Sequence, residues 1–141
     1  MNAHNIHACC VAIGENGVLI RGQPGSGKSD LLLRLLDESS LVQLVADDQV
    51  YLKEESGFLY ASAPKILAGK LEIRGQGIVA RPHLAMIKLS HVIDLVDPAD
   101  INRLPHAEEL LTILQDHTFP CLKLDGRLAS APARIRAFLR G

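Results

Sequence analysis

A glycine-rich segment of eight residues constrains this chain more than any other feature, and it reads Gly22-Gln23-Pro24-Gly25-Ser26-Gly27-Lys28-Ser29. It fits the pattern G-x-x-x-x-G-K-[ST] of a phosphate-binding loop, or P-loop. Its glycines let several backbone N–H groups turn toward one point, which makes a nest for anions. Lys28 can reach the terminal phosphates of a nucleotide, and the Ser29 hydroxyl can ligate Mg²⁺. We therefore expect residues 22–29 to bind a nucleotide through its phosphates.

The flanking sequence gives this loop the setting that it needs. Residues 18–21 predict a strand before it, and leucines at 3.6-type spacing predict a helix at about 28–38 after it. That helix would present its N-terminus to the same phosphates. A second apolar run, residues 41–46, predicts the next strand. The order strand–loop–helix–strand favours a parallel βαβ pairing in an α/β fold.

The remaining sequence predicts shorter elements. Residues 7–13 predict a strand, and residues 14–17 a hairpin turn, because Asn-Gly is a strong turn signal. We expect β segments at 49–53, 57–61, 84–96 and 119–124, and a helix at 106–115. A final helix is expected at 131–139, with Ser130 as its N-cap and Pro132 in its first turn. Its arginines (Arg134, Arg136 and Arg140) suit a solvated face, a surface for partner docking or a contact with phosphate.

Charge and cysteine content exclude several classes of protein. The net charge of −1 lacks the basic excess of a nucleic-acid or membrane-surface binder, so we expect neither partner. No apolar stretch approaches the roughly 20 residues of a membrane span. The three cysteines are expected to be free thiols in a reducing cytoplasm. With 141 residues and no long linker, the chain 1–141 is expected to be one domain.

Two carboxylates, Asp47 and Asp48, follow the second apolar run. Ligands of open α/β sheets bind at the carboxyl ends of strands, so either acid can lie near the terminal phosphate. One would bind Mg²⁺ or its water, and the other would accept a proton from an attacking hydroxyl. Alternatively, Asp47 and Asp48 are both solvated residues of a turn and have no role in a site.

Three segments, in this order, resemble the catalytic domain of the HPr kinase/phosphorylase family. The loop G-x-G-K-S stands at residues 25–29, L-[VI]-A-D-D at 44–48, and L-E-[IV]-R-G-x-G-[IV] at 71–78. His7 matches the active-site histidine of the family. The resemblance covers residues 7–78, about half of the chain.

The resemblance implies a P-loop-containing mixed sheet with flanking helices, like that of the HPr kinase catalytic domain. It implies an ATP-dependent protein-serine kinase that transfers the γ-phosphoryl group of ATP to a serine of the phosphocarrier protein HPr. Such a reaction regulates the phosphotransferase system. ATP and Mg²⁺ would be the cofactors, and an HPr-like phosphocarrier the partner.

Roles for single residues also follow from the resemblance. Lys28 would neutralise the transferred phosphate, while Ser29 and Glu72 would ligate Mg²⁺. Asp47 would accept the proton of the substrate serine, Asp48 would support it, and His7 would orient the site. The implied nucleotide-binding residues are Gly22, Gln23, Pro24, Gly25, Ser26, Gly27, Lys28 and Ser29.

The chain departs from the family pattern in four places. One is that the Gly/Ala-rich stretch that usually follows the L-E-x-R-G segment is missing. It looks like the shortened variant of some proteobacteria, which lacks the separate N-terminal domain. Asp30 stands where Glu is usual. The later G-R-N-L segment, which carries an active-site arginine, has a partial match at residues 126–129, so no role is assigned to Arg127. These departures weaken the expectation of phosphorylase activity and of hexameric assembly more than that of ATP binding, and a homo-oligomer stays compatible with the sequence.

Two other functions stay open on the sequence alone. The first is a nucleotide-sensing regulatory protein that transfers no phosphate. The second is a small-molecule kinase, because P-loops serve many acceptors. An assay with labelled ATP and HPr separates the three.

Overall fold

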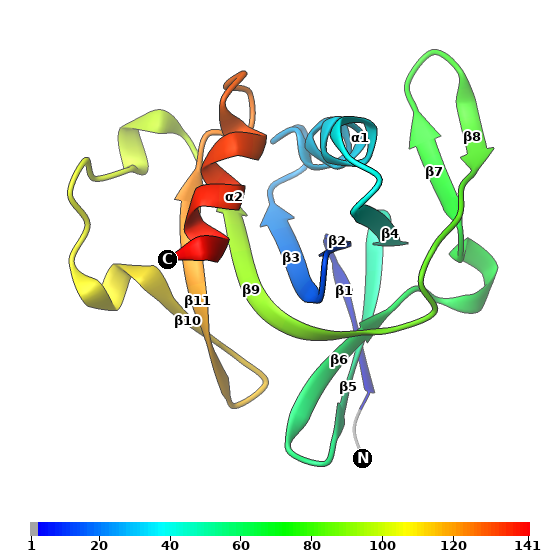
Figure 1. The fold of residues 1–141 in the computed structure, drawn as a ribbon, viewed down its shortest axis with the longest axis horizontal. Helices are drawn as coiled ribbons and strands as arrows, with labels where there is room; N and C mark the ends of the chain where they lie inside the picture. Colours follow the sequence, from blue (N-terminus) through cyan, green and yellow to red (C-terminus); the bar gives the residue numbers. More distant parts are fainter. Residues whose placement is uncertain (1–2) are drawn as a thin grey trace.

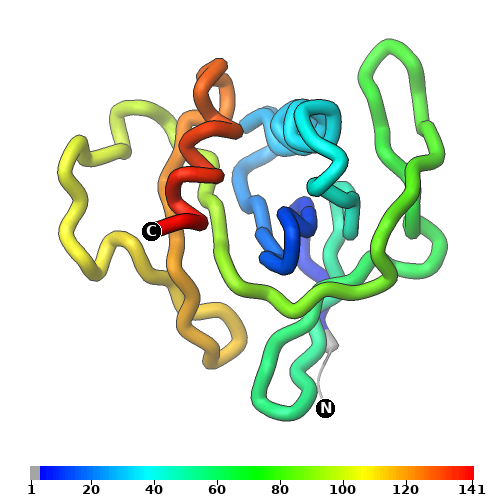
Figure 2. Tube along the Cα trace, viewed as in Figure 1, coloured from blue at the N-terminus to red at the C-terminus, as the bar shows by residue number. Residues whose placement is uncertain are grey.

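A curled mixed sheet forms most of the structure, a computed structural model that describes residues 3–141 (Figure 1; Figure 2). The sheet has nine strands, and β7 and β8 form a separate hairpin. The strands are β1 (Ala3–His7), β2 (Cys9–Ile13), β3 (Asn16–Gly22), β4 (Val42–Ala46), β5 (Gln49–Glu55), β6 (Phe58–Ser62), β7 (Lys70–Ile73), β8 (Gly77–Ala80), β9 (Ile87–Leu95), β10 (Leu111–Leu114) and β11 (His117–Leu124). The helices are α1 (Lys28–Glu38) and α2 (Ala131–Arg140), and the 3-10 helices are η1 (Lys65–Leu67), η2 (Pro98–Asp100) and η3 (Ala107–Leu110).

The long strand β9 joins the two halves of the sheet. It pairs antiparallel with β6 near its start, and parallel with both β3 and β11 further along. The P-loop strand β3 therefore lies next to β9 in the middle of the sheet. The carboxyl ends of β3, β9 and β11 meet at one edge, where α1 and α2 lie (Figure 1).

The predicted βαβ unit is present with one difference. Strands β3 and β4 run in the same direction, but they are not neighbours, because β2 lies between them and pairs antiparallel with both. The expected strand over residues 7–13 is divided at Ala8, since β1 pairs with β5 and β2 pairs with β3 and β4. The prediction of a direct parallel pair was therefore wrong, because the preceding hairpin strand fills the gap.

The hairpin turn predicted over residues 14–17 exists but is shorter, because only Gly14 and Glu15 form it and Asn16 and Gly17 already belong to β3. Ile13 pairs with Asn16, and Ala12 pairs with Gly17. Gly17 serves a different purpose from a turn. A Cβ atom there would collide with the carbonyl group of Lys88 in β9. The missing side chain thus allows the close approach of β3 and β9.

The helix expected at residues 106–115 is wrong. One short 3-10 helix, η3, ends at Leu110, and the chain then forms the hairpin β10–β11. Gln115 and Asp116 both have positive φ, 47° and 67°, as the tight turn of such a hairpin requires. The β-branched residues Thr112 and Ile113 favour a strand, and pairing with β11 outweighs the helical spacing of the leucines.

The other element predictions are confirmed, with boundaries that differ by a few residues. Helix α1 begins at Lys28, as expected, and α2 begins after Ser130. Ser130 does not cap α2 through its side chain; its hydroxyl instead accepts a hydrogen bond from Arg134 Nε at 2.8 Å. No helix within residues 3–141 is long and apolar enough to cross a membrane.

Apolar residues fill both faces of the sheet because side chains alternate along each strand. On one face, Leu31, Leu32 and Leu35 of α1 pack with Ile135 of α2. The other face is covered by the curled part of the sheet, through residues such as Leu52 of β5. Strand β2 contributes to both faces: Cys9 and Val11 point to the helices, Cys10 and Ala12 to the opposite core. The P-loop helix is thus fixed to the sheet next to its own strand.

The contact at Gly17 gives a test of this packing. Gly17→Ala is expected to lower the free energy of unfolding by about 1–3 kcal/mol, because the added methyl group must displace the backbone of β9. Urea unfolding followed by circular dichroism measures the change. Glu15→Ala, at the exposed hairpin turn, is the control and should have little effect. Equal stability of the two variants would mean that β3 and β9 are not in close contact here.

Candidate active site

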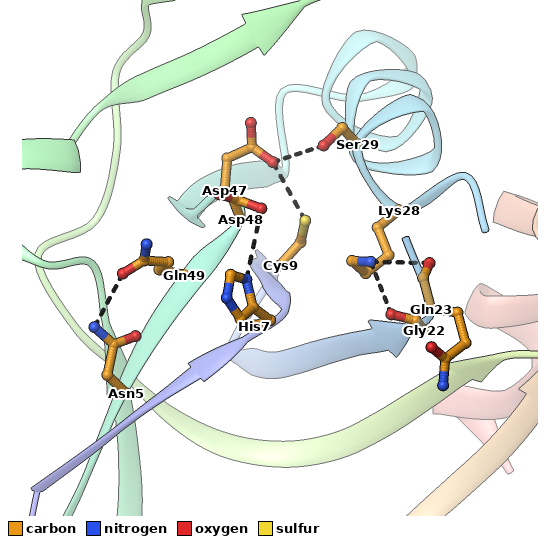
Figure 3. Close-up of polar contacts among 10 residues, drawn as sticks. All are labelled: Asn5, His7, Cys9, Gly22, Gln23, Lys28, Ser29, Asp47, Asp48 and Gln49. Atoms are coloured by element: carbon orange, nitrogen blue, oxygen red, sulfur yellow. Dashed lines mark hydrogen bonds and ion pairs between the residues drawn. The ribbon is translucent and has the colours of Figure 1, made fainter. Parts of the chain in front are cut away.

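The P-loop connects the end of β3 at Gly22 to the start of α1 at Lys28. Gly25 and Gly27 have φ values of 82° and 97°, a region that favours glycine. The Lys28 ammonium group donates hydrogen bonds to the carbonyl oxygens of Gly22, at 2.8 Å, and Gln23, at 3.3 Å (Figure 3). The lysine thus lies over its own loop, within reach of whatever the loop binds.

Several polar groups of this loop suit an anion. The N-cap residue of α1 is Gly27, so no side-chain bond caps the N–H groups of the first turn. The Ser26 hydroxyl oxygen is buried and has no hydrogen-bond partner among residues 3–141. A phosphate at the helix N-terminus would satisfy these donors, and Lys28 would add a positive charge. The loop therefore fits the phosphates of a nucleotide.

Asp47 is the buried acid of the site, with 7% of its surface exposed. One carboxylate oxygen, Oδ1, accepts hydrogen bonds from the Ser29 hydroxyl at 2.9 Å and from the Cys9 thiol at 3.3 Å (Figure 3). The other oxygen accepts the backbone N–H of Glu72 at 3.1 Å. Asp47 thus links α1, β2 and β7 at the carboxyl end of β4.

Asp48 points away from this cluster because the backbone turns sharply between β4 and β5. The Gln49 N–H donates to the Asp47 carbonyl at 2.9 Å, and Asp48 has a φ of 72°. Such a conformation costs a non-glycine residue roughly 1–2 kcal/mol, and strain of this kind often marks functional sites. The Asp48 side chain is 70% exposed and lies 3.9 Å from Nδ1 of His7, which is 81% exposed. The two residues form a pair that solvent and a substrate can reach.

The hairpin β7–β8 brings Glu72 to the site. Leu71 is buried in the core beside α1, whereas the Glu72 side chain is exposed. The Glu72 backbone is fixed by its bond to Asp47. The hairpin itself stands apart from the main sheet (Figure 1). Its turn is thus free to face a second molecule.

The oxygen atoms at this site suit Mg²⁺ better than a metal that takes all of its ligands from protein side chains. Within residues 3–141, no three His, Cys, Asp or Glu side chains converge as metal ligands. Mg²⁺ usually binds one or two protein oxygens and takes its other ligands from water and substrate phosphates. The Ser29 hydroxyl and the Asp47 carboxylate provide such oxygens beside the P-loop.

Two residues that the sequence analysis did not place at the site, Arg127 and Cys9, contact it in the structure. Arg127, in the loop after β11, donates a hydrogen bond from Nη2 to the Gly25 carbonyl at 2.9 Å. Arg34 of α1 binds the carbonyl oxygens of Gly126 and Leu128 and so holds that loop. The second added residue is Cys9, which contacts Asp47. The partial match at residues 126–129 was the only sequence signal for Arg127, and Cys9 had none.

Burial keeps the thiol beside Asp47 neutral. Desolvation, together with the nearby Asp47 carboxylate, raises the pKa of Cys9 to about 12. Desolvation also raises the pKa of Cys10, and it raises that of Cys121 to about 12. Cys9 is therefore a hydrogen-bond donor to Asp47 and not a nucleophile at neutral pH.

These features define a P-loop domain with a pair of acids at the next parallel strand end. The HPr Serine kinase C-terminal domain family matches residues 1–115 of the chain. The chain belongs to this family.

Curated relatives are named HPr kinase/phosphorylase. That of Clostridium tetani is 41% identical over 90 residues, which make up 64% of this chain and 28% of the relative. That of Clostridium acetobutylicum is 42% identical over 88 residues, 62% of this chain and 28% of the relative. The match thus spans little more than a quarter of the length of these relatives.

A solved structure has the same fold over nearly the whole chain. It is the Hpr(Ser) kinase/phosphatase from Coxiella burnetii, with a TM-score of 0.83 and 28% sequence identity. The match covers 97% of this chain and 88% of that chain. The predicted fold, a P-loop-containing mixed sheet like that of an HPr kinase catalytic domain, is confirmed.

The raised pKa values of the thiols predict their reactivity. At pH 8, iodoacetamide should label none of the three cysteines in the native protein, because the thiolate is the reactive form and all three thiols are buried. In denaturant, all three should react. Mass spectrometry counts the added groups. Rapid labelling of Cys9 in the native protein would show that the carboxylate cluster opens to solvent.

Proposed function

We propose that this domain is an ATP-dependent protein-serine kinase that acts on the phosphocarrier protein HPr. The observation that carries the proposal is the 2.9 Å bond between Ser29 of the P-loop and Asp47 at the end of β4. It joins a phosphate-binding loop to an acid beside the position of the terminal phosphate. Membership of the HPr Serine kinase C-terminal domain family supports the serine acceptor.

In this proposal, residues 22–29 hold the phosphates of ATP. Lys28 leaves the loop carbonyls and contacts the terminal phosphate, where its charge offsets the charge of the transferred group. The Ser29 hydroxyl and Glu72 would ligate Mg²⁺, and Asp47 would hold the Ser29 hydroxyl in place. Mg²⁺ would supply positive charge that offsets the charge of the phosphates.

Geometry supports a division of roles between the two acids that differs from the one expected from sequence. Asp47 is buried, and both of its oxygens already accept hydrogen bonds. A general base must instead reach the proton that it removes. Asp48 is exposed and lies beside His7. We therefore assign metal positioning to Asp47 and proton acceptance to Asp48, which His7 orients.

The proposed step transfers one phosphoryl group. The serine hydroxyl of HPr gives its proton to the Asp48 carboxylate while its oxygen forms a bond to the γ-phosphorus. The bond between that phosphorus and the bridging oxygen of ADP breaks, and ADP leaves with the electron pair. Positioning and charge neutralisation supply most of the rate enhancement in reactions of this kind.

HPr as the acceptor is supported by the names of the relatives, HPr kinase/phosphorylase and Hpr(Ser) kinase/phosphatase. The reverse reaction and a homo-oligomer are not required by the site described here. The three free thiols of Cys9, Cys10 and Cys121 support a location in the reducing cytoplasm. A nucleotide sensor and a small-molecule kinase are the alternatives that the assay below distinguishes.

The central test incubates the protein with γ-labelled ATP, Mg²⁺ and HPr. Label should appear on HPr as phosphoserine, identified by mass spectrometry. Lys28→Ala should bind ATP at least about tenfold more weakly, because it loses a charged contact to phosphate, and should transfer little label. Nucleotide binding without transfer would favour the sensor, and label on a small molecule would favour the small-molecule kinase.

Replacing Asp47 and Asp48 by asparagine, one at a time, should impair different properties, nucleotide binding in one case and the transfer rate in the other. Asp48→Asn should keep Mg-ATP affinity but lower the transfer rate by roughly 10²–10⁴-fold, the usual loss for an acid–base group. Asp47→Asn should weaken Mg-ATP binding by about tenfold or more, because a charged acceptor beside the metal is lost. Calorimetry measures binding, and single-turnover transfer measures the rate.

Asp37→Asn, on the exposed face of α1, is the matched control and should change neither quantity. The reverse outcome is equally clear. If Asp47→Asn binds Mg-ATP normally but transfers no phosphate, while Asp48→Asn transfers at the unmodified rate, the base is Asp47 and our assignment is wrong.

A further inference from the structure

We propose that the cavity between α2, β11 and the loop of residues 96–110 binds a second small ligand, an amphipathic anion with an apolar body and one acidic group. The cavity has a volume of about 690 Å³. It shares no lining residue with the smaller cavity beside the P-loop, which residues 23–26 and Arg127 line in part. The proposed site is therefore separate from the P-loop, and it does not depend on phosphotransfer.

The loop that forms the outer wall of this cavity keeps its shape through bonds of its own. Residues 96–110 connect β9 to β10 and bow away from α2 (Figure 1). The two carboxylate oxygens of Glu109 accept hydrogen bonds from the Asn102 amide, at 2.7 Å, and from the His106 N–H, at 2.8 Å. The Glu109 N–H donates to the His106 carbonyl at 2.9 Å. Because these bonds lie within the loop, the wall stands without packing on the helix, and the cavity is preformed.

The lining of the cavity is largely apolar. Leu122 of β11, Leu128 of the following loop and Phe138 of α2 are part of it. The Phe138 ring packs edge-on against His91, with ring centroids 5.9 Å apart, and this contact holds the aromatic wall in place. Sites for small organic ligands have volumes of roughly 300–1,000 Å³ and linings of this kind. An apolar body placed here would be removed from water, which favours binding.

Three cations also line the cavity, and each comes from a different wall. They are Arg103 of the loop, Lys123 of β11 and Arg134 of α2. All three are exposed, and none of them forms an ion pair within residues 3–141. Arg134 donates from Nε to the neutral hydroxyl of Ser130. An anionic group of a ligand would gain charge-assisted hydrogen bonds from these side chains.

The two acids of the lining, Glu109 and Asp125, do not balance these cations. Backbone N–H groups already donate to both carboxylates, from His106 to Glu109 at 2.8 Å and from Arg127 to Asp125 at 3.0 Å. The lining therefore has three cations against two acids, and the cations have no anionic partner. An excess of positive charge around a cavity favours an anionic ligand.

The apolar lining and the unpaired cations together select one class of ligand. Inorganic phosphate would pair with the cations but would leave the apolar lining in water. A neutral apolar molecule would cover the lining but would leave the cations without an anion. A molecule that joins an apolar ring system to one carboxylate or sulfonate group satisfies both parts of the cavity.

The first experiment compares two fluorescent probes that differ in one acidic group. 1-Anilinonaphthalene-8-sulfonate carries a sulfonate, and N-phenyl-1-naphthylamine has the same rings without it. The protein should bind the sulfonate probe at one site and about tenfold or more tightly than the neutral probe, because contacts between charged groups are added. Fluorescence titration measures both affinities. Equal affinities would refute an anion site.

A substitution on α2 tests whether the probe lies in this cavity. Ala137 lines the cavity and is exposed, so Ala137→Tyr adds a ring there without removing a core side chain. This variant should bind the sulfonate probe more than about tenfold more weakly, because the ring takes up the volume of the ligand. Ala133→Tyr places the same ring on the same helix, at an exposed position outside both cavities, and should bind the probe normally. Normal binding by Ala137→Tyr, shown to be folded by thermal unfolding, overturns the proposal.

A double substitution tests the cations and does not depend on the tyrosine variant. Arg103→Gln with Lys123→Gln changes two exposed side chains. The variant should bind the neutral probe as the unmodified protein does, and should lose most of its preference for the sulfonate probe. Lys53→Gln with Lys65→Gln removes the same charge at exposed positions outside both cavities and should keep the preference. An unchanged preference in the first variant would place the anion elsewhere and contradict the proposal.

Mg-ATP distinguishes this site from the P-loop. A saturating concentration of Mg-ATP should leave the affinity for the sulfonate probe unchanged, because the two cavities share no lining residue. Displacement of the probe by Mg-ATP would show that the probe occupies the P-loop, and the proposal would be wrong. None of these measurements uses phosphotransfer, so failure of the proposed kinase and failure of this second site give different results.

Discussion

The hydrogen bond between Ser29 and Asp47 is the interaction on which the site depends. It ties the first turn of the P-loop helix to the end of β4, although β2 separates the strands that flank this helix. The same carboxylate accepts bonds from Cys9 and from the backbone of Glu72. A buried carboxylate without such partners would destabilise the folded protein by several kcal/mol. Asp47 is therefore satisfied only when the P-loop, β2 and the hairpin β7–β8 are all in place.

The parts of the site that the sequence predicted are those encoded locally. The P-loop is a continuous pattern, its helix follows from leucine spacing, and the acids follow directly after an apolar strand. Each of these signals lies within about ten residues, so no knowledge of distant contacts is needed. The position of both acids at the strand end was likewise predictable from a general rule for α/β sheets.

What could not be predicted depends on contacts between distant segments. Residues 111–114 have a leucine spacing that suits a helix, yet pairing with β11 makes them a strand. The sequence of the P-loop segment does not indicate that β2 lies between β3 and β4. Which of the two carboxylates contacts Ser29 is also a property of the folded chain: Asp47 accepts its hydrogen bond, whereas Asp48 follows in a backbone conformation with positive φ. Arg127 reaches Gly25 across 102 residues of sequence.

The two sides of the P-loop therefore differ in how substitutions of their residues affect the site. The side with Ser29, Asp47 and Glu72 lies within residues 1–115, the part that matches the family, and its contacts form one connected cluster. The side with Arg127 and α2 lies beyond residue 115. It contacts the P-loop through the bond from Arg127 to Gly25, and it contacts α1 through Arg34 and the packing of Ile135. The hydrogen bonds of Asp47 include no residue of this second side, so substitutions there can leave the contacts of Asp47 in place.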